Sequence, residues 1–248
     1  MCTVVLLFGL LPGYPLVLAA NRDEFISRHS SRPHRWQPEP GAPAIFAGRD
    51  ELKGGTWLGI NQHGVLAGIV NRTTGQRDPE KVSRGSLVIR CLCEKTLEGI
   101  ERLLAGEDLS RYNPFTLFSY AGGRALMATN HPSREIWPLE AGIHIITNCD
   151  PRDRADSKKA YLLKTYLSPL PEEPGVLRAR LVSLCRDHEE PQGFPFPACV
   201  HLEGYGTVSS AIAWIAERWE ESRFEYCEGP PCQGSYLDLT GEFVSIFS

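Results

Sequence analysis

The most constraining feature of the chain is an almost unbroken apolar stretch near its start, interrupted in the middle by proline and glycine. Residues 4–20 read VVLLFGLLPGYPLVLAA. A helix would be broken at Pro12-Gly13 and Pro15, and a membrane span needs about twenty apolar residues without such a break. The pattern is typical of two buried strands joined by a Pro-Gly turn. Because the first three residues carry no cation, as an export signal would, we expect a cytoplasmic protein without a membrane span.

Length and composition indicate one folded domain. The chain has 248 residues, of which 42% are hydrophobic and 23% charged, and its formal net charge is −4. These values are those of a globular chain rather than a disordered one. The slight acidic excess is unlike the clustered cations that bind nucleic acid. We therefore expect a single domain spanning residues 1–248 and no nucleic-acid partner.

Eight cysteines and seven histidines raise the question of metal sites and disulfides. No two cysteines have C-x-x-C spacing, and disulfide frameworks are typical of small secreted chains. The histidines are scattered, and the sequence contains neither a P-loop nor a complete dinucleotide-binding glycine pattern. We expect reduced cysteines, no metal and no cofactor.

Strands grouped in hairpins, with helices between the groups, predict an α+β fold with antiparallel sheets. After the first hairpin we expect a polar loop over residues 21–43. Further strands are predicted over residues 56–60, 65–70, 115–121, 124–129, 143–147, 208–215, 223–227 and 243–247. Helices are predicted over residues 86–93, 96–105, 157–167 and 176–186, with Asp156 or Ser157 capping the third.

Cys2 is the residue with the clearest chemical potential. Removal of Met1 would leave a residue that carries both a thiol nucleophile and an α-amino base. The amine, with a reference pKa of about 7.7–8.0, can take the thiol proton directly or through water. The thiol, with a reference pKa of about 8.5, needs a nearby cation to become a thiolate at neutral pH. A cysteine at this position is also commonly an inert buried side chain, so the hypothesis depends on its neighbours.

The first hairpin returns charged residues to Cys2. A turn centred on Pro12 and Gly13 places Cys2 opposite Asp23, and a slip of one residue places it opposite Arg22. An aspartate there could hold the new ammonium, whereas an arginine could favour the thiolate. A solvated turn with local ion pairs is the alternative interpretation of the same charges.

Acyl transfer also requires hydrogen-bond donors for a developing oxyanion, and two asparagines are candidates. Asn71 and Asn148 each follow a predicted strand. Asparagine at a strand end is usually a turn former, and the sequence alone does not bring either residue to Cys2.

Several short motifs occur in a fixed order along nearly the whole chain. They are Met1-Cys2, Ala20-Asn21-Arg22-Asp23-Glu24-Phe25, Gly54-Gly55-Thr56-Trp57-Leu58-Gly59, Arg84-Gly85-Ser86-Leu87-Val88, Tyr112-Asn113-Pro114-Phe115 and Tyr205-Gly206-Thr207. In this order they resemble the NRDE family, also called the transport and Golgi organisation protein 2 family. That family looks like a branch of the N-terminal nucleophile (Ntn) hydrolases, so the resemblance implies a four-layer αββα sandwich of two antiparallel sheets between helices.

The resemblance also implies a chemistry. The better understood relatives are the choloylglycine hydrolases and penicillin V acylases, which cleave amide bonds other than peptide bonds and also open with Met-Cys-Thr. By this similarity Cys2 is the nucleophile, Arg22 steadies the sulfur and Asp23 fixes the α-amino group. Asn71 and Asn148 match the oxyanion positions of those acylases.

Two functions from different classes therefore compete. The first is an Ntn-type amidohydrolase that acts on a small acyl-amide substrate through a Cys2 thioester. The second is a non-catalytic carrier or trafficking factor for haem or another amphipathic ligand, because eukaryotic relatives are associated with Golgi organisation and haem movement. One position departs from the family pattern: Val208 stands where many members carry arginine, and the late active-site arginine of the acylases has no counterpart that we can place.

Overall fold

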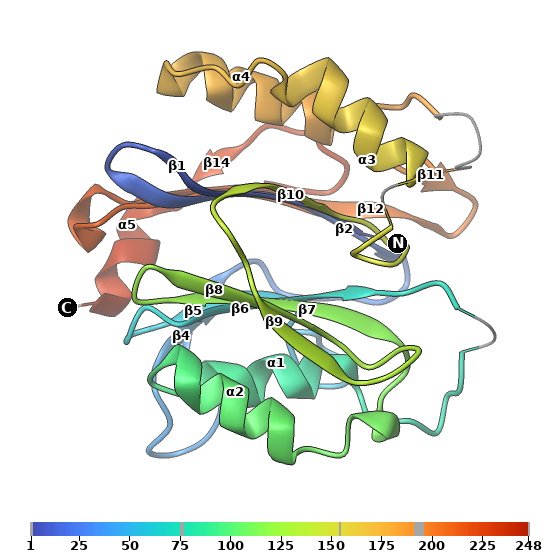
Figure 1. The fold of residues 1–248 in the computed structure, drawn as a ribbon, viewed down its shortest axis with the longest axis vertical. Helices are drawn as coiled ribbons and strands as arrows, with labels where there is room; N and C mark the ends of the chain where they lie inside the picture. The colour runs from blue at the N-terminus through green and yellow to red at the C-terminus, as the bar shows by residue number, and fades with distance from the viewer. Residues whose placement is uncertain (1, 75–76, 154, 191–195, 248) are drawn as a thin grey trace. The chain divides into compact units, whose positions relative to one another are not determined.

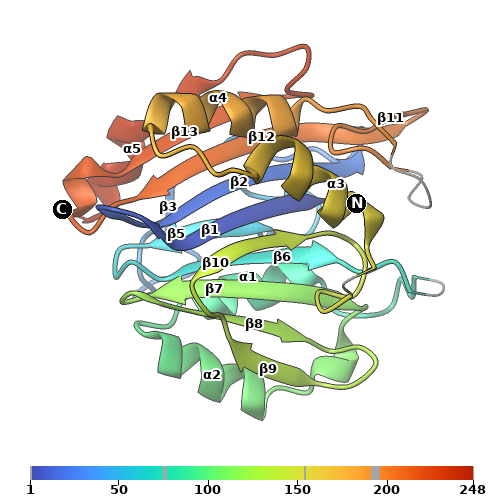
Figure 2. The same ribbon diagram turned by 45° about the horizontal axis from the view of Figure 1, so that its top comes forward.

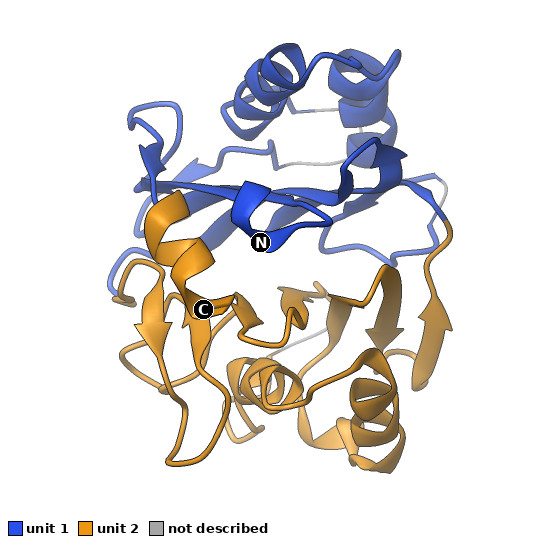
Figure 3. Cartoon of the chain, turned by 90° about the vertical axis from the view of Figure 1, so that its left-hand side faces the viewer, with its two compact units in different colours: residues 1–27, 141–239 blue, residues 28–140, 240–248 orange. Residues whose placement is uncertain are grey.

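The computed structural model describes residues 2–74, 77–153, 155–190 and 196–247. The chain forms two compact units, each assembled from two separate segments (Figure 3). Unit 1 comprises Met1–Ser27 and Ala141–Leu239, and unit 2 comprises Arg28–Glu140 and Thr240–Ser248. Each contains an antiparallel sheet and helices, so the predicted α+β class is confirmed. That the whole chain is a single domain stays a prediction.

The sheet of unit 1 has the strand order β10-β1-β2-β12-β13-β14, with β11 added on β12 (Figures 1 and 2). Its strands are β1 (Thr3–Leu11), β2 (Tyr14–Phe25), β10 (Gly142–Ile146), β11 (His201–Leu202), β12 (Tyr205–Ile215), β13 (Arg223–Glu228) and β14 (Leu237–Asp238). Helices α3 (Ser157–Leu162) and α4 (Pro174–Cys185) cover one face of this sheet. A π-helical turn (Leu163–Leu167) continues α3, and a 3-10 turn (Trp219–Glu221) precedes β13.

Alternation along the strands divides the residues of unit 1 between the two faces of its sheet. Val5, Leu7, Val17 and Ala19 belong to the hydrophobic cluster that includes Leu177, Leu181 and Leu184 of α4. The same alternation places Thr3, Asn21 and Asp23 on this helix-covered face. It places Cys2 and Arg22 on the opposite face.

The first hairpin contains a register shift that decides what lies opposite Cys2. The turn at Pro12-Gly13 forms as predicted, and Leu11 pairs with Tyr14. Between Phe8 and Leu11 the register shifts, and Gly9 has a φ of +64°, a conformation that glycine adopts at little cost. Beyond the shift Thr3 pairs with Asn21, so the register continues to Cys2 opposite Arg22. The placement of Cys2 opposite Asp23 is wrong, and the alternative slipped register is correct.

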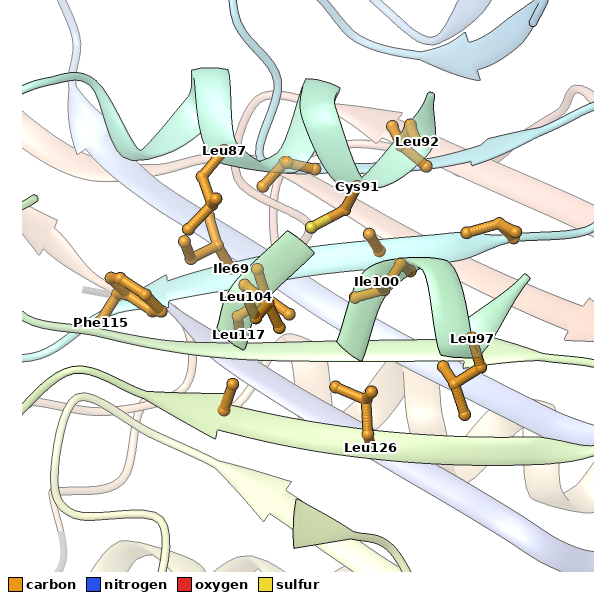
Figure 4. Packing of buried hydrophobic residues seen from close by; sticks show 14 of the residues in the cluster. Ile69, Leu87, Cys91, Leu92, Leu97, Ile100, Leu104, Phe115, Leu117 and Leu126 are labelled. Carbon is orange, nitrogen blue, oxygen red and sulfur yellow. The ribbon is translucent and has the colours of Figure 1, made fainter. Parts of the chain in front are cut away.

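Unit 2 has the strand order β3-β4-β5-β6-β7-β8-β9, with all neighbours antiparallel. Its strands are β3 (His34–Trp36), β4 (Ile45–Ala47), β5 (Leu58–Asn61), β6 (Leu66–Asn71), β7 (Phe115–Ala121), β8 (Arg124–Thr129) and β9 (Glu135–Pro138). Its helices are α1 (Arg84–Leu92), α2 (Leu97–Gly106) and α5 (Thr240–Val244), with 3-10 turns at Leu109–Arg111 and Ser245–Phe247. Leu87, Ile100 and Leu104 of α1 and α2 pack on Ile69 and Leu117 of the sheet (Figure 4).

Most predicted elements are confirmed, and two are corrected. Residues 21–25 and 34–36 of the predicted loop are strands instead: β2 continues to Phe25, where its polar end pairs with β12, and β3 pairs with β4. Residues 243–247 are not a strand but belong to α5 and a 3-10 turn. Phe243 and Ile246 are both buried at a helical spacing of three, and a short apolar run does not distinguish helix from strand. Among the described residues, no helix is long and apolar enough to cross a membrane.

Candidate active site

Cys2 lies at the end of β1, which is flanked by β2 and β10 in the sheet of unit 1. Cys2 is buried, with 9% of its surface exposed. Val4 pairs with Ile146, the last residue of β10, so the chain at Asn148 emerges at the same end of the sheet as Cys2. Met1, whose removal the nucleophile hypothesis requires, lies outside the described residues.

The surroundings of the Cys2 thiol are less favourable to a thiolate than the sequence suggests. Burial is the largest effect and raises the pKa of Cys2, and the charge of Asp23 acts in the same direction. Arg22 lowers this pKa, as expected, but does not outweigh burial. The Cys2 Sγ lies 4.0 Å from the carbonyl oxygen of Asp23, to which the thiol can donate a weak hydrogen bond. Burial therefore acts against formation of the Cys2 thiolate.

Asp23 is a buried carboxyl held by the neighbouring strand β12. The hydroxyl of Thr207 donates to Asp23 Oδ1 at 2.6 Å, and the hydroxyl of Tyr205 donates to the Asp23 carbonyl at 3.2 Å. The backbone N–H of Val200 donates to the Thr207 oxygen at 2.9 Å. Burial raises the pKa of Asp23 to about 6, while the Thr207 hydrogen bond and the charge of Lys158 act in the opposite direction.

Lys158 is a functional candidate that sequence reasoning missed. It lies in the first turn of α3 with 1% exposure, and its Nζ donates to the carbonyl of Pro197 at 2.8 Å. Burial lowers the pKa of Lys158, whereas the charges of Asp23, Asp156 and Cys2 raise it. A signal was available, because a cation in the first turn opposes the helix dipole. The cost is only about 0.3–1 kcal/mol, so this signal is weak.

Asn21, the first residue of the Asn-Arg-Asp-Glu motif, ties the sheet of unit 1 to its outer layer. Its Nδ2 donates to the carbonyls of Cys185, at the end of α4, and Ala198, each at 2.8 Å. The first motif residue therefore fixes the backbone. The next two, Arg22 and Asp23, are the buried charged residues beside Cys2.

Asn148 is buried in a loop fixed to the start of α3. The hydroxyl of Thr147 donates to Asp156 Oδ2 at 2.5 Å, and Asp156 Oδ1 accepts from the backbone of Lys159 as the helix cap. This confirms Asp156 as the cap of the predicted helix. The loop that carries Asn148 is thus joined to the helix that carries Lys158.

The two remaining residues singled out from the sequence, Asn71 and Val208, lie on strands that are not neighbours of β1. Asn71 ends β6 of unit 2, where it pairs with Phe115 and is half-buried. Val208, the departure from the family pattern, lies at a register shift of β12 opposite Arg22 and Asp23 and is half-buried. The structure brings Cys2, Arg22, Asp23 and Asn148 to one end of one sheet, and the role of each stays a prediction.

Potential metal ligands gather elsewhere in unit 1. Within the described ranges, one group of at least three suitable side chains lies close together: His188, Cys199, His201 and Cys232. It does not include Cys2.

The chain is similar to three solved structures that share its fold. It has 14% identity and a TM-score of 0.58 to penicillin V acylase from Agrobacterium tumefaciens, covering 96% of this chain and 86% of that one. It has 11% identity and a TM-score of 0.55 to the Caenorhabditis elegans orthologue of N-acylethanolamine-hydrolyzing acid amidase, and the match covers 85% of this chain and 92% of that one. It has 10% identity and a TM-score of 0.52 to a conjugated bile acid hydrolase variant from Clostridium perfringens, covering 98% and 94%. The predicted Ntn-hydrolase fold is confirmed.

Two curated relatives show how much of the chain is similar in sequence. The chain is 38% identical over 96 residues to the human transport and Golgi organization protein 2 homolog, which is 37% of this chain and 35% of that protein. It is 32% identical over 124 residues to the Drosophila melanogaster protein of that name, covering 46% and 42%. The matches therefore span less than half of these relatives. The sequence profile of one family matches residues 1–226, and the chain belongs to that family, Transport and Golgi organisation 2.

Proposed function

We propose that the protein is an N-terminal-cysteine amidohydrolase, which cleaves linear amide C–N bonds other than peptide bonds through a thioester on Cys2. The observation that carries the proposal is the gathering of a cysteine, a buried carboxyl and two buried cations at one end of the unit 1 sheet. The solved structures with the same fold are named as an acylase, an amidase and a hydrolase. Those names support the same class of reaction here.

The proposed reaction uses the thiol and the α-amino group of one residue. With Met1 removed, the Cys2 amine takes the thiol proton while Sγ attacks the carbonyl carbon of the amide. The side-chain amide of Asn148 donates a hydrogen bond to the resulting oxyanion. The ammonium then protonates the departing nitrogen as the C–N bond breaks and a thioester remains. Water, deprotonated by the same amine, attacks the thioester, releases the carboxylic acid and restores the thiol.

The charges beside Cys2 fit this use of an internal base. Because burial raises the pKa of the thiol, proton transfer to the amine during the attack is favoured over a preformed thiolate. A carboxyl with a pKa of about 6 is ionised at neutral pH and can stabilise the transient ammonium. Arg22 and Lys158 provide compensating positive charge. Many family members carry an arginine at the position of Val208, and Lys158 is our candidate for the cation that takes its place in this chain.

Asn71 is assigned its oxyanion role by family resemblance alone. A donor to a developing oxyanion typically contributes a factor of about 10²–10³ in kcat. We expect a loss of this size in Asn148→Ala. An equal loss in Asn71→Ala would support its participation in catalysis. An unchanged kcat would mean that Asn71 has only a structural role at the end of β6.

The test is hydrolysis of a panel of N-acyl amides that vary in acyl chain and leaving amine, followed by release of the amine. Intact mass first establishes that Met1 is absent. Cys2→Ala should lower the rate by at least about a thousandfold, as expected for loss of a nucleophile. Cys93→Ala, a half-buried cysteine of unit 2, is the matched control and should retain full activity. Equal rates in the two variants would refute the proposal.

The carrier function stays the competing prediction, and the same protein preparation distinguishes it. Titration with haem would support it if the absorption band shifts saturably while no amide in the panel is cleaved. Cys2-dependent hydrolysis without a saturable shift would instead favour the amidohydrolase.

A further inference from the structure

Four side chains of unit 1 that the proposed reaction does not use converge on one point. His188 follows α4, Cys199 and His201 lie on the segment that enters β11, and Cys232 lies in the loop after β13. One ligand atom from each of the four lies within 4.8 Å of every other. No pair has the spacing of a zinc-binding motif, so it is the fold that brings the four together.

The distances within this cluster match the edges of a tetrahedron around a metal ion. Cys199 Sγ lies 3.7 Å from Cys232 Sγ and 3.6 Å from His201 Nε2, and Cys232 Sγ lies 3.2 Å from His201 Nε2. Zinc bonds of about 2.3 Å to sulfur and about 2.0–2.1 Å to nitrogen give tetrahedral edges of about 3.8 Å for S–S and about 3.6 Å for S–N. Two of the three measured distances agree with these values closely, and the third is shorter.

His188 has the supporting contact typical of a metal-binding histidine. Its Nδ1 lies 3.1 Å from the carbonyl oxygen of Cys199, so an N–H at this position can donate to that oxygen. This tautomer leaves a lone pair on Nε2. Histidine ligands commonly use their second nitrogen in this way, which fixes the orientation of the ring. The rings of His188 and His201 are 5.1 Å apart.

The backbone that carries the ligands is held in place independently of them. The N–H of Cys199 donates to the carbonyl of Asp187 at 2.8 Å. Arg186 donates to the carbonyls of Pro231 at 2.8 Å and Gly234 at 3.2 Å, on both sides of Cys232. A metal would therefore enter a largely preformed cluster rather than gather free loops.

We propose that His188, Cys199, His201 and Cys232 form a tetrahedral site for zinc. Binding releases two protons, because Zn²⁺ replaces the hydrogens of the two thiols while both imidazoles remain neutral. All four positions are filled by protein atoms, as in structural rather than catalytic zinc sites. The proposal does not depend on the amidohydrolase reaction.

The location of the cluster gives the metal a positioning role. The carbonyl of Pro197 accepts from Lys158, and the carbonyl of Ala198 accepts from Asn21. The N–H of Val200, two residues after Ala198, donates to Thr207, which in turn holds Asp23. Zinc would join this segment to α4 and to the loop after β13. We therefore expect it to stabilise the segment that supports Asp23 and Lys158.

A disulfide between Cys199 and Cys232 is the alternative use of the two thiols. It would shorten the 3.7 Å separation of the sulfurs to about 2.05 Å and would leave the convergence of two histidines unexplained. An intact mass lower by two hydrogens under non-reducing conditions, with no zinc bound, would overturn the zinc proposal.

The test uses the full chain, reduced, stripped with a chelator and titrated with Zn²⁺ and separately with Co²⁺. We expect one equivalent of zinc per chain, the visible bands of tetrahedral Co²⁺ with thiolate ligands, and a rise in Tm on adding zinc. His201→Ala and Cys232→Ser alter a surface and a half-buried residue, so they should fold yet bind at least about tenfold more weakly. His63→Ala and Cys93→Ser of unit 2 are the matched controls and should bind like the wild type. Absence of saturable binding, or equal affinity in all four variants, would overturn the proposal.

Discussion

In each sheet a buried asparagine donates two hydrogen bonds to backbone carbonyls outside the sheet, but only the asparagine of unit 2 also has partners for its side-chain oxygen among the described residues. Asn61 of unit 2 donates to the carbonyls of Leu92 and Glu94 at the end of α1, and its Oδ1 accepts from the N–H groups of His63 and Val65. Asn21 of unit 1 also makes two donations, one to the carbonyl of Cys185 at the end of α4 and one to the carbonyl of Ala198. Its buried Oδ1, however, has no hydrogen-bond partner in the part of the chain that the structure describes.

The two units also differ in the pKa of a buried carboxyl, which is lowered in unit 2 and raised in unit 1. In unit 2, hydrogen bonds from Arg90 and Tyr112 hold Glu107, and the bond from Arg90 is the largest effect that lowers its pKa. In unit 1, burial dominates and raises the pKa of Asp23 to about 6. A buried acid whose pKa is raised toward neutral pH, beside a specific charge partner, is a candidate functional group. By this comparison Asp23, rather than Glu107, is the candidate for a chemical role.

Replacing the two asparagines tests the first part of this comparison. Asn61→Ala removes four hydrogen bonds and leaves buried backbone groups unsatisfied, so we expect a loss of about 4 kcal/mol in the free energy of unfolding. Asn21→Ala removes two, and we expect about 2 kcal/mol. Denaturant unfolding of both variants measures the difference. Equal losses, or a larger loss for Asn21→Ala, would contradict the comparison.

Asp23→Asn tests the buried acid of unit 1 through the pH dependence of stability. The folded pKa of about 6 exceeds the reference value of 3.8, so folding favours the protonated carboxyl. The contribution of Asp23 is therefore fully present below about pH 4 and is lost as pH rises through about 6. The loss is on the order of 3 kcal/mol. Relative to wild type, Asp23→Asn should gain this stability between pH 4 and pH 7, measured by unfolding at each pH; a flat difference would refute the raised pKa.

Glu107→Gln should show the opposite sign. Because the folded pKa of Glu107 is lowered, its contribution is present above the reference value of 4.5 and is lost as pH falls through the folded value. We expect the variant to be about 1–2 kcal/mol less stable at neutral pH, with the difference shrinking in acid. If the difference instead grows as pH falls, the ion pair with Arg90 is not what stabilises this carboxyl.

Lys158→Met sharpens the account of unit 1 with a smaller effect. The charge of Lys158 lowers the pKa of Asp23, so its removal should move the pH range of the Asp23 stability loss upward. Lys159→Met is the matched control, because the Lys159 ammonium binds the carbonyls of Asp150 and Pro151 instead. Its unfolding curves should show the wild-type pH range. The same shift in both variants would show that the charge of Lys158 does not act specifically on Asp23.

Local patterns were sufficient for most of the fold. The Pro12-Gly13 turn, the two helices before Leu109 and the hairpin over residues 115–129 all follow from spacing and turn residues. The register at Cys2 could not be fixed, because the shift at Gly9 breaks the regular count between the turn and the end of the strand. The C-terminal apolar run is helical rather than a strand, and its sequence alone does not distinguish the two.

The site was predictable in part for a similar reason. Arg22 and Asp23 could be placed near Cys2 because one hairpin connects them. Lys158 and Thr207 reach the same region through α3 and β12, which no spacing in the sequence relates to β1. The four residues of the proposed zinc site likewise come from three separate segments, with Cys199 and His201 on the same one.

The most direct test of the amidohydrolase account is the mass of the protein during a single turnover. Wild-type protein shown to lack Met1 is mixed with an activated N-acyl amide, quenched in acid and mapped by peptide mass. The account predicts one acyl group per chain on Cys2, which disappears as the free acid forms and is absent from Cys2→Ala. An unmodified Cys2 in protein that still hydrolyses the amide, or protein from its native cells that keeps Met1 throughout, would contradict it.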